Sequence, residues 1–217
     1  MSQIILDFGS GNTCGNDYNT MRKMIDELKK VDSGKHEIII KWQLFKKAGD
    51  NIPLFDGAFD YAYEYARKYG YKTTASVFDL ESLKFLLNYD VPFIKIANRH
   101  DLDWLIGEVP RKIPVYVSVD NMSVGESMQY SLPVGHINQE RDIALFCVSQ
   151  YPASIEEYER RFSKGSLKHG ISDHTIGLDL FKKHQPRIWE KHYKLSDSTG
   201  LDAGPFAITP EELREIL

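Results

Sequence analysis

The chain has 217 residues, of which 42% are hydrophobic and 27% are charged, and its formal net charge is -4. These values are typical of a soluble globular protein, and the acidic balance argues against a nucleic-acid partner, which needs a basic face. No apolar run reaches the roughly 18 residues of a membrane span, and the N-terminus lacks the basic flank and cleavage site of a signal peptide. We therefore expect a cytoplasmic protein with no nucleic-acid or membrane partner.

The two cysteines, Cys14 and Cys147, do not have the spacing of a metal site. In a cytoplasmic protein they are expected to be reduced thiols. The sequence leaves a disulfide between them open.

Apolar runs of strand length alternate with amphipathic runs of helix length along the chain. The strand-like runs cover residues 3–9, 37–45, 72–78, 92–98, 113–120, 142–149, 168–175 and 187–195. The helical runs cover residues 17–31, 57–70, 79–89, 100–109, 123–132, 154–164, 177–185 and 209–217, of which 123–132 is the weakest. In the first helix the apolar side chains that share one face are Met21, Met24, Ile25 and Leu28.

Several helix ends carry recognisable capping residues. Gly70 is expected to cap the C-terminus of the second helix, and Asp79 the N-terminus of the third. Thr209 is expected to cap the last helix, with Pro210 at its first position.

Eight strand–helix units predict parallel strands joined by right-handed crossovers. Their number favours a compact (β/α)8 TIM barrel that forms a single domain over residues 1–217. An open doubly wound sheet is the alternative, and it usually has a glycine-rich phosphate loop after its first strand. The segment GSGNTCG does not have that spacing.

Polar residues gather at the carboxyl ends of the predicted strands, which face the active site in such a barrel. Lys41 and Lys95 lie inside apolar strands, where an ammonium group is costly to bury unless an anion pairs with it. Together with the serines of other strand ends, they would suit a phosphorylated or carboxylated ligand. His174 and His192, from adjacent strands, could hold one divalent metal ion.

Each of these residues also has an ordinary structural explanation. Either lysine could extend its amine out of the strand end, and the serines could be turn hydroxyls. A single histidine is more often a hydrogen-bonded structural residue than a ligand. The convergence of all eight strand ends on polar residues favours a site.

Several motifs, in one order, resemble those of the sialic acid synthase family, the phosphoenolpyruvate-dependent N-acetylneuraminate, legionaminate and pseudaminate synthases. The segments GISDHTIG and WEKHYKL look like the family's S-D-H-T-x-G and E-K-H-F-T-L motifs. The segments IKWQ, SVFDLESLKFLLNYDVPFIKIAN and CVSQYPAS are also similar to family blocks. The matches run from Ile5 to about Ala203.

The resemblance implies a (β/α)8 barrel enzyme, a carbon–carbon bond-forming transferase of carbohydrate biosynthesis. It would condense phosphoenolpyruvate with the aldehyde of an open-chain amino sugar, giving a sialic-acid-like sugar acid and phosphate. It also implies a divalent metal cofactor, usually manganese with magnesium or cobalt as alternatives, and a homodimer. We expect the barrel domain alone, without the family's C-terminal antifreeze-like domain.

The resemblance also implies roles for individual residues. The catalytic residues would be Lys41, Lys95, His174 and His192, of which His174 and His192 would bind the metal. The phosphoenolpyruvate-binding residues would be Lys41, Lys95, Ser118, Ser149 and Ser172. The residues around the acceptor sugar would be Asp7, Gln43, Tyr151 and Asp202.

The chain also departs from the family motifs. Thr13 and Ala203 stand where the family has histidines, and the family's K-I-x-S-G-E is KIANRH here, which ends in His100. These departures leave two alternatives open: a non-catalytic barrel that acts as a scaffold or binding protein, and another metal-dependent lyase or aldolase acting on a sugar phosphate.

Overall fold

The computed structural model describes residues 1–47, 49–120 and 142–217. Within these ranges the strands form a closed barrel in which each strand pairs in parallel with the next, and the last pairs with the first. The strands are β1 (Gln3–Asp7), β2 (Glu37–Leu44), β3 (Lys72–Val77), β4 (Ile94–Ile96), β5 (Val115–Val119), β6 (Ile143–Cys147), β7 (Gly170–Asp173) and β8 (Ile188–His192). The predicted (β/α)8 barrel is therefore confirmed, and the open sheet is excluded.

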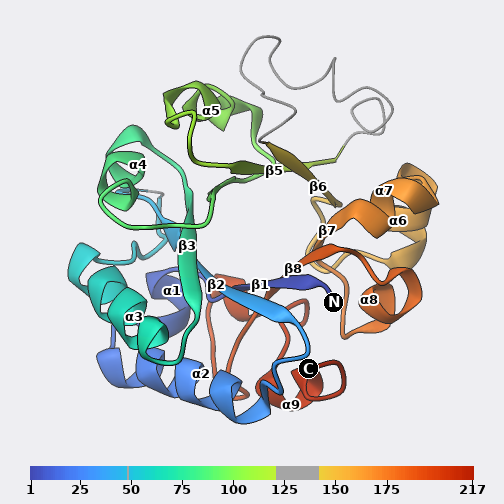
Figure 1. Ribbon diagram of the computed structural model, residues 1–217, viewed down its shortest axis with the longest axis horizontal. Coiled ribbons are helices and arrows are strands. Elements are labelled where there is room, and N and C mark those ends of the chain that lie inside the picture. The colour runs from blue at the N-terminus through green and yellow to red at the C-terminus, as the bar shows by residue number, and fades with distance from the viewer. Residues whose placement is uncertain (48, 121–141) are drawn as a thin grey trace.

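Helices surround this ring of strands (Figure 1). The α-helices are α1 (Gly11–Cys14), α2 (Tyr18–Val31), α3 (Asp56–Lys68), α4 (Leu80–Leu86), α5 (Leu105–Glu108), α6 (Ile155–Arg161), α7 (Lys164–His169), α8 (Asp179–His184) and α9 (Pro210–Leu213). The 3₁₀ turns η1 (His100–Leu102) and η3 (Leu201–Ala203) lie in the loops after β4 and β8. The helix expected over residues 123–132 lies outside the described residues.

The interior of the barrel is filled at one level by apolar side chains, which we call the apolar plug. The plug consists of Ile5, Ile39, Phe93, Tyr116, Leu145 and Ile188. Side chains alternate between the two faces of a strand, so the residue two positions further along points into the barrel as well. Those residues are Asp7, Lys41, Lys95, Ser118, Cys147 and Glu190. The strand period therefore places a polar layer directly above the plug, at the carboxyl ends of the strands.

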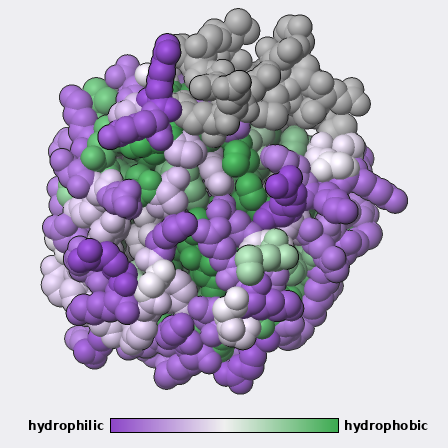
Figure 2. Space-filling view, viewed as in Figure 1, coloured by the Kyte–Doolittle hydropathy of each residue, from purple (hydrophilic) through white to green (hydrophobic). Residues whose placement is uncertain are grey.

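A larger apolar core lies between the barrel and the helices. The face of α2 predicted from helical spacing packs there, and Met21, Met24, Ile25 and Leu28 are all fully buried. Figure 2 shows one face of the molecule, on which hydrophilic residues cover most of the surface and hydrophobic residues form smaller patches toward the middle.

The expected caps are mostly present. The Asp79 carboxylate accepts from the Ser82 amide at the start of α4, and Thr209 forms a capping box with Glu212 at the start of α9. Gly70 differs by one position, because Tyr69 is the C-cap of α3 and Gly70 follows it with φ +82°. A left-handed φ of this kind is the reason that a glycine ends the helix. In the described ranges, no helix combines the length and the apolar character that crossing a membrane requires.

Candidate active site

A cavity of about 460 Å³ opens at the carboxyl ends of the strands, above the apolar plug. It brings together every residue to which the sequence assigned a site role. These are Asp7, Lys41, Gln43, Lys95, Ser118, Ser149, Tyr151, Ser172, His174, His192 and Asp202. Their placement in one cavity is a structural finding, whereas their individual roles stay predictions.

Strand register explains why Asp7 lies at the centre of one wall. Asp7 is level with Lys41 on one neighbouring strand and with His192 on the other. Its Oδ2 accepts hydrogen bonds from Lys41 Nζ at 2.7 Å and from Gln43 Nε2 at 3.0 Å. Burial acts to raise the pKa of Asp7, but the Lys41 ammonium, His192 and the Gly9 amide outweigh it and lower the pKa to about 2. Asp7 is therefore a buried carboxylate that stays ionised.

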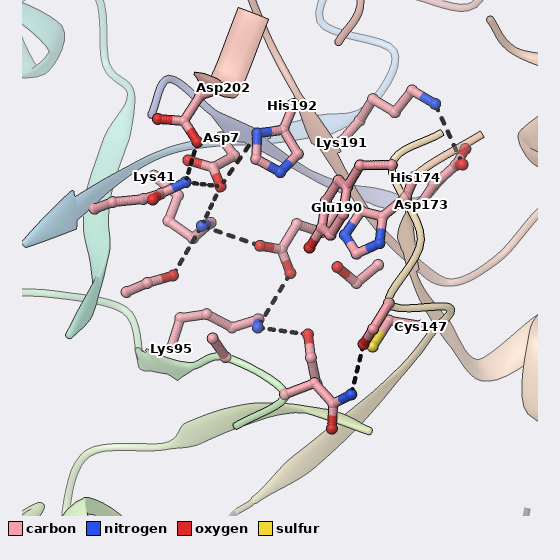
Figure 3. Close-up of a pocket in the computed structure, with 18 of the residues that line it drawn as sticks. Asp7, Lys41, Lys95, Cys147, Asp173, His174, Glu190, Lys191, His192 and Asp202 are labelled. Carbon is pink, nitrogen blue, oxygen red and sulfur yellow. Dashed lines mark hydrogen bonds and ion pairs between the residues drawn. The ribbon is translucent and has the colours of Figure 1, made fainter. Parts of the chain in front are cut away.

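Glu190 of β8 lies between the two buried lysines, as Figure 3 shows. Its Oε1 is 3.1 Å from Lys41 Nζ and its Oε2 is 3.5 Å from Lys95 Nζ. Burial would raise the pKa of Glu190, yet Lys95 and Lys41 hold it below its usual value. Burial lowers the pKa of Lys95, aided by the Lys41 charge, whereas Asp7 and Glu190 together raise that of Lys41 against the effect of burial. One carboxylate thus holds two ammonium groups on the cavity floor.

Serine hydroxyls complete the coordination of both lysines. Lys41 donates to Ser76 Oγ at 2.8 Å, and Lys95 donates to Ser118 Oγ at 2.6 Å. A hydroxyl that accepts from an ammonium group keeps its own proton, which it can donate to an anionic ligand. The floor therefore offers both charge and hydroxyl donors to a phosphate or a carboxylate.

The two histidines lie side by side at the carboxyl ends of β7 and β8, with ring centroids 5.9 Å apart. His174 Nδ1 donates to the Val148 carbonyl at 2.7 Å, which leaves the lone pair on Nε2. Burial, followed by the proximity of His192, lowers the pKa of His174 to about 4, so the ring is neutral at physiological pH.

These rings have the chemistry that a divalent metal ion requires. His192 Nδ1 is buried and finds no hydrogen-bond partner among the described residues; its distance of 3.8 Å from Asp7 Oδ2 is too long for one. Neutral imidazole nitrogens suit divalent transition metals. No cluster of three or more His, Cys, Asp or Glu side chains suited to a metal occurs in the described part of the chain. The two rings could each give one nitrogen to such an ion, which would leave positions open for water or substrate.

Aromatic rings and a second carboxylate form the outer wall of the cavity. The centroid of the Tyr151 ring lies 4.2 Å from the centroid of the His174 ring and 5.0 Å from that of the Phe206 ring. Asp202, in η3, accepts from Gln43 Nε2 at 3.3 Å and from the Ser10 amide at 3.3 Å. Burial and the nearby Asp7 raise the pKa of Asp202.

Glu190 and Ser76 also line the cavity, although no role was predicted for either of them from the sequence. A signal was present for Glu190, because it precedes His192 by two residues on one strand and must share its face. Its neighbour Lys191 points away from the cluster and forms a fully buried pair with Asp173, Nζ to Oδ1 3.2 Å (Figure 3). That pair joins β7 to β8 and serves the barrel wall.

The residues that depart from the family motifs differ in how far they are buried. The side chain of His100 is 83% exposed, and its ring approaches Asp103. Of the tripeptide Asn98–Arg99–His100, Asn98 and Arg99 are the two whose atoms line the cavity. Thr13, in α1, and Ala203, in η3, are both buried.

Comparisons with known proteins agree with this architecture. A solved structure of N-acetylneuraminic acid (sialic acid) synthetase from Leptospira borgpetersenii serovar Hardjo-bovis, in complex with citrate, superposes with a TM-score of 0.74 at 24% identity. It matches 98% of this chain and 80% of that one. The spore coat polysaccharide biosynthesis protein spsE of Bacillus subtilis superposes with a TM-score of 0.74 at 19% identity, over 99% of this chain and 65% of that one. At these identities the structures establish the shared barrel fold.

Sequence comparison assigns the family. N-acetylneuraminate-9-phosphate synthase of Drosophila melanogaster is 27% identical over 157 residues, which are 66% of this chain and 41% of that protein. The chain thus spans about two fifths of that relative's length. The family model described as the NeuB family matches residues 51–217, and the chain belongs to this family.

Proposed function

We propose that the protein condenses phosphoenolpyruvate with the aldehyde of an open-chain amino sugar, releasing phosphate and forming a sialic-acid-like sugar acid. The observation that carries the proposal is the cavity floor, where Lys41 and Lys95 are both buried and share the Glu190 carboxylate below a pair of histidines. Membership of the NeuB family supports it. The Drosophila relative, named as an N-acetylneuraminate-9-phosphate synthase, supports the same class of reaction.

Phosphoenolpyruvate would bind on the floor. Lys41 and Lys95 would face its phosphate and carboxylate, and the buried Ser118 and Ser172 would donate hydroxyl protons to the same oxygens. Ser149, which is exposed, would be a further hydroxyl donor to phosphoenolpyruvate nearer the mouth of the cavity. Both lysines are held in place before the ligand arrives, so little reorganisation is needed during the reaction. Preorganised donors of this kind typically contribute about 3–4 kcal/mol each to transition-state stabilisation.

His174 and His192 would hold a divalent metal ion, for which we propose manganese, with magnesium and cobalt as alternatives. Such an ion supplies a Lewis acid for an aldehyde oxygen. The protein's own contribution is the orientation of the ligands. The Val148 carbonyl fixes the tautomer of His174, and Tyr151 packs against its ring.

The acceptor sugar would lie between the histidines and the outer wall. Asp7, Gln43 and Asp202 form a connected set of acceptors and donors suited to sugar hydroxyl and amide groups. The exposed ring of Tyr151 offers an apolar face to the carbon skeleton of the sugar.

In the proposed reaction a carbon–carbon bond forms between the methylene carbon of phosphoenolpyruvate and the aldehyde carbon. Water adds to the carbon that carries the phosphate ester, and the carbon–oxygen bond to phosphate then breaks. The Lys41 ammonium group would stay charged beside the departing phosphate, since Asp7 and Glu190 together raise its pKa.

The proposal is tested by measuring phosphate release from phosphoenolpyruvate with manganese, across a panel of amino-sugar and simple sugar aldehydes. We expect release that depends on one acceptor class and on the metal, and that His174→Ala abolishes. Release of phosphate from a sugar phosphate without consumption of phosphoenolpyruvate would instead indicate that the protein is a lyase or aldolase. Binding of manganese with no release from any acceptor would indicate a scaffold or binding protein.

We further propose that the protein acts in the cytoplasm, where phosphoenolpyruvate is formed, and that it forms a homodimer. Light scattering coupled to size-exclusion chromatography measures the second point directly. A mass of one chain across the working concentration range would contradict it.

A further inference from the structure

Arg99 differs from the other cations of the cavity in where its carboxylate partner lies. The loop after β4 carries it to the cavity wall, next to Asn98. Its side chain is 52% exposed, and it pairs with Asp101, Nε to Oδ1 3.1 Å and Nη2 to Oδ2 2.5 Å. Asp101 is not among the described residues that line the cavity.

The other described lining cations are neutralised within the wall itself. Lys41 and Lys95 face the carboxylates of Asp7 and Glu190, two charges against two. Lys191 is paired with Asp173 in the same way. The carboxylates of Asp7 and Glu190 therefore offset part of the positive charge that Lys41 and Lys95 present to an anionic ligand on the floor. Arg99 is the described lining cation whose ion-pair partner, Asp101, lies outside the cavity lining.

The pair between Arg99 and Asp101 can be exchanged at low cost. Both side chains are more than half exposed, 52% and 62%. Exposed ion pairs contribute about 0–1 kcal/mol, because solvent screens the attraction and two side chains lose freedom. A phosphate offers a guanidinium group the same two-pronged geometry with a higher charge.

Two hydroxyl and amide donors lie beside Arg99 on the same wall. Asn98 Nδ2 donates to Ser149 Oγ at 2.8 Å, which links the loops after β4 and β6. Ser149 therefore keeps its hydroxyl proton for a further acceptor. Deeper in the cavity, Ser118 is held by Lys95 and keeps its proton likewise.

We propose that Arg99, with Asn98 and Ser149, forms a phosphate-binding subsite at the mouth of the cavity, and that Arg99 exchanges Asp101 for the phosphate of a ligand. This inference rests on the proposed function, because it assigns a phosphorylated substrate to the same cavity. In that reaction the phosphate belongs either to phosphoenolpyruvate or to a phosphorylated acceptor sugar.

The test is calorimetric titration of phosphoenolpyruvate, in the absence of acceptor, into the wild-type protein and three variants. Arg99→Gln removes the charge, and we expect the Kd to rise by about tenfold, the effect of losing one charge-assisted hydrogen-bonded contact. Asp101→Asn removes the competitor, and we expect the Kd to fall. Arg67→Gln is the matched control, because Arg67 pairs with Glu64 at 2.6 Å on an exposed helix surface, away from the cavity, and we expect no change.

Opposite shifts in Arg99→Gln and Asp101→Asn would assign the subsite to the phosphate of phosphoenolpyruvate. If phosphoenolpyruvate binding is unchanged, the same variants are compared in steady-state assays with phosphorylated and unphosphorylated acceptors. A rise in KM for the phosphorylated acceptor alone would assign the subsite to the acceptor's phosphate. Equal behaviour of Arg99→Gln, Arg67→Gln and wild type in both assays would overturn the inference.

A different result is expected if the proposed function itself is wrong. In that case the wild-type protein neither binds phosphoenolpyruvate nor releases phosphate from it. If only the subsite is wrong, the wild-type protein does both, and Arg99→Gln behaves like the wild type.

Discussion

The carboxylate of Glu190, on β8, lies 3.1 Å from the ammonium group of Lys41, on β2, across the intervening strand β1. The same ammonium group lies 2.7 Å from Asp7 on β1 itself. Three successive strands around the barrel are thus joined by charge directly above the apolar plug. This arrangement has consequences for stability that can be measured separately from activity.

Replacing Lys41 with methionine leaves two buried carboxylates without their shared cation. Removing one partner of a buried pair typically costs about 3–5 kcal/mol, so we expect a comparable fall in the free energy of unfolding by urea denaturation. The matched control is Lys72→Met, since Lys72 pairs with Glu37 at 2.9 Å in an exposed position. There the loss should stay below about 1 kcal/mol. Equal losses of unfolding free energy in the two variants would show that the buried ion pairs of Lys41 stabilise the fold no more than an exposed pair does.

The lowered pKa of Asp7 predicts that the protein loses stability over a defined range of acidic pH. Its pKa is lowered from 3.8 to about 2 in the folded protein. A depressed folded-state pKa contributes stability above the unfolded pKa, which is lost as the pH falls through the folded value. We expect about 2 kcal/mol to be lost between roughly pH 4 and pH 2.

Asp7→Asn tests this assignment. The variant should be less stable than wild type at neutral pH, and the difference between the two should shrink as the pH falls toward 2, because the wild-type contribution is lost there. Thermal unfolding at a series of pH values measures both quantities. A difference that stays constant across this range would show that Asp7 is not the group responsible.

The histidine pair predicts metal binding that does not depend on turnover. We expect His174→Ala and His192→Ala each to weaken manganese binding at least ~10-fold, because each removes one of two protein ligands. His100→Ala is the control, since that side chain is 83% exposed and lies off the cavity wall. Calorimetric titration of manganese alone gives the affinities. Undiminished binding in both variants would place the metal site elsewhere.

The burial of the two cysteines predicts that their thiols react slowly in the native protein. Cys14 and Cys147 are free and buried, which bears out the expectation of reduced thiols in this structure. Burial raises the pKa of Cys14 to about 11 and that of Cys147 to about 12. Because the thiolate is the reactive form, both should react with a thiol reagent at pH 8 far more slowly in the native protein than in denaturant. Fast native labelling of either residue would contradict its burial.

Much of this site follows from the period of a strand. Alternation within IIIKWQ and RIWEKH shows that Lys41 and Glu190 point into the barrel, since each lies two residues beyond an inward apolar side chain. The sequence could therefore predict a polar layer at the strand ends. It could not predict that Glu190 contacts both lysines, because that contact depends on closure of the sheet between β8 and β1.

The loops were less predictable than the strands. The sequence singled out His100 as a departure from the family motif. In the structure Arg99 reaches the cavity, while His100 turns to the surface beside Asp103. The direction of a side chain in a loop depends on backbone angles set by the turn η1, and no sequence period fixes them. Asp202 lines the cavity because the amide of Ser10, in another loop, holds its carboxylate.

We propose that this cavity joins phosphoenolpyruvate to a sugar aldehyde. Mass spectrometry of the products formed from carbon-labelled phosphoenolpyruvate, manganese and an amino-sugar aldehyde tests it most directly. We expect one sugar acid that contains the labelled unit and the whole acceptor, and none with Lys41→Met. Recovery of intact phosphoenolpyruvate, or of labelled pyruvate alone, with every acceptor tested would contradict the claim.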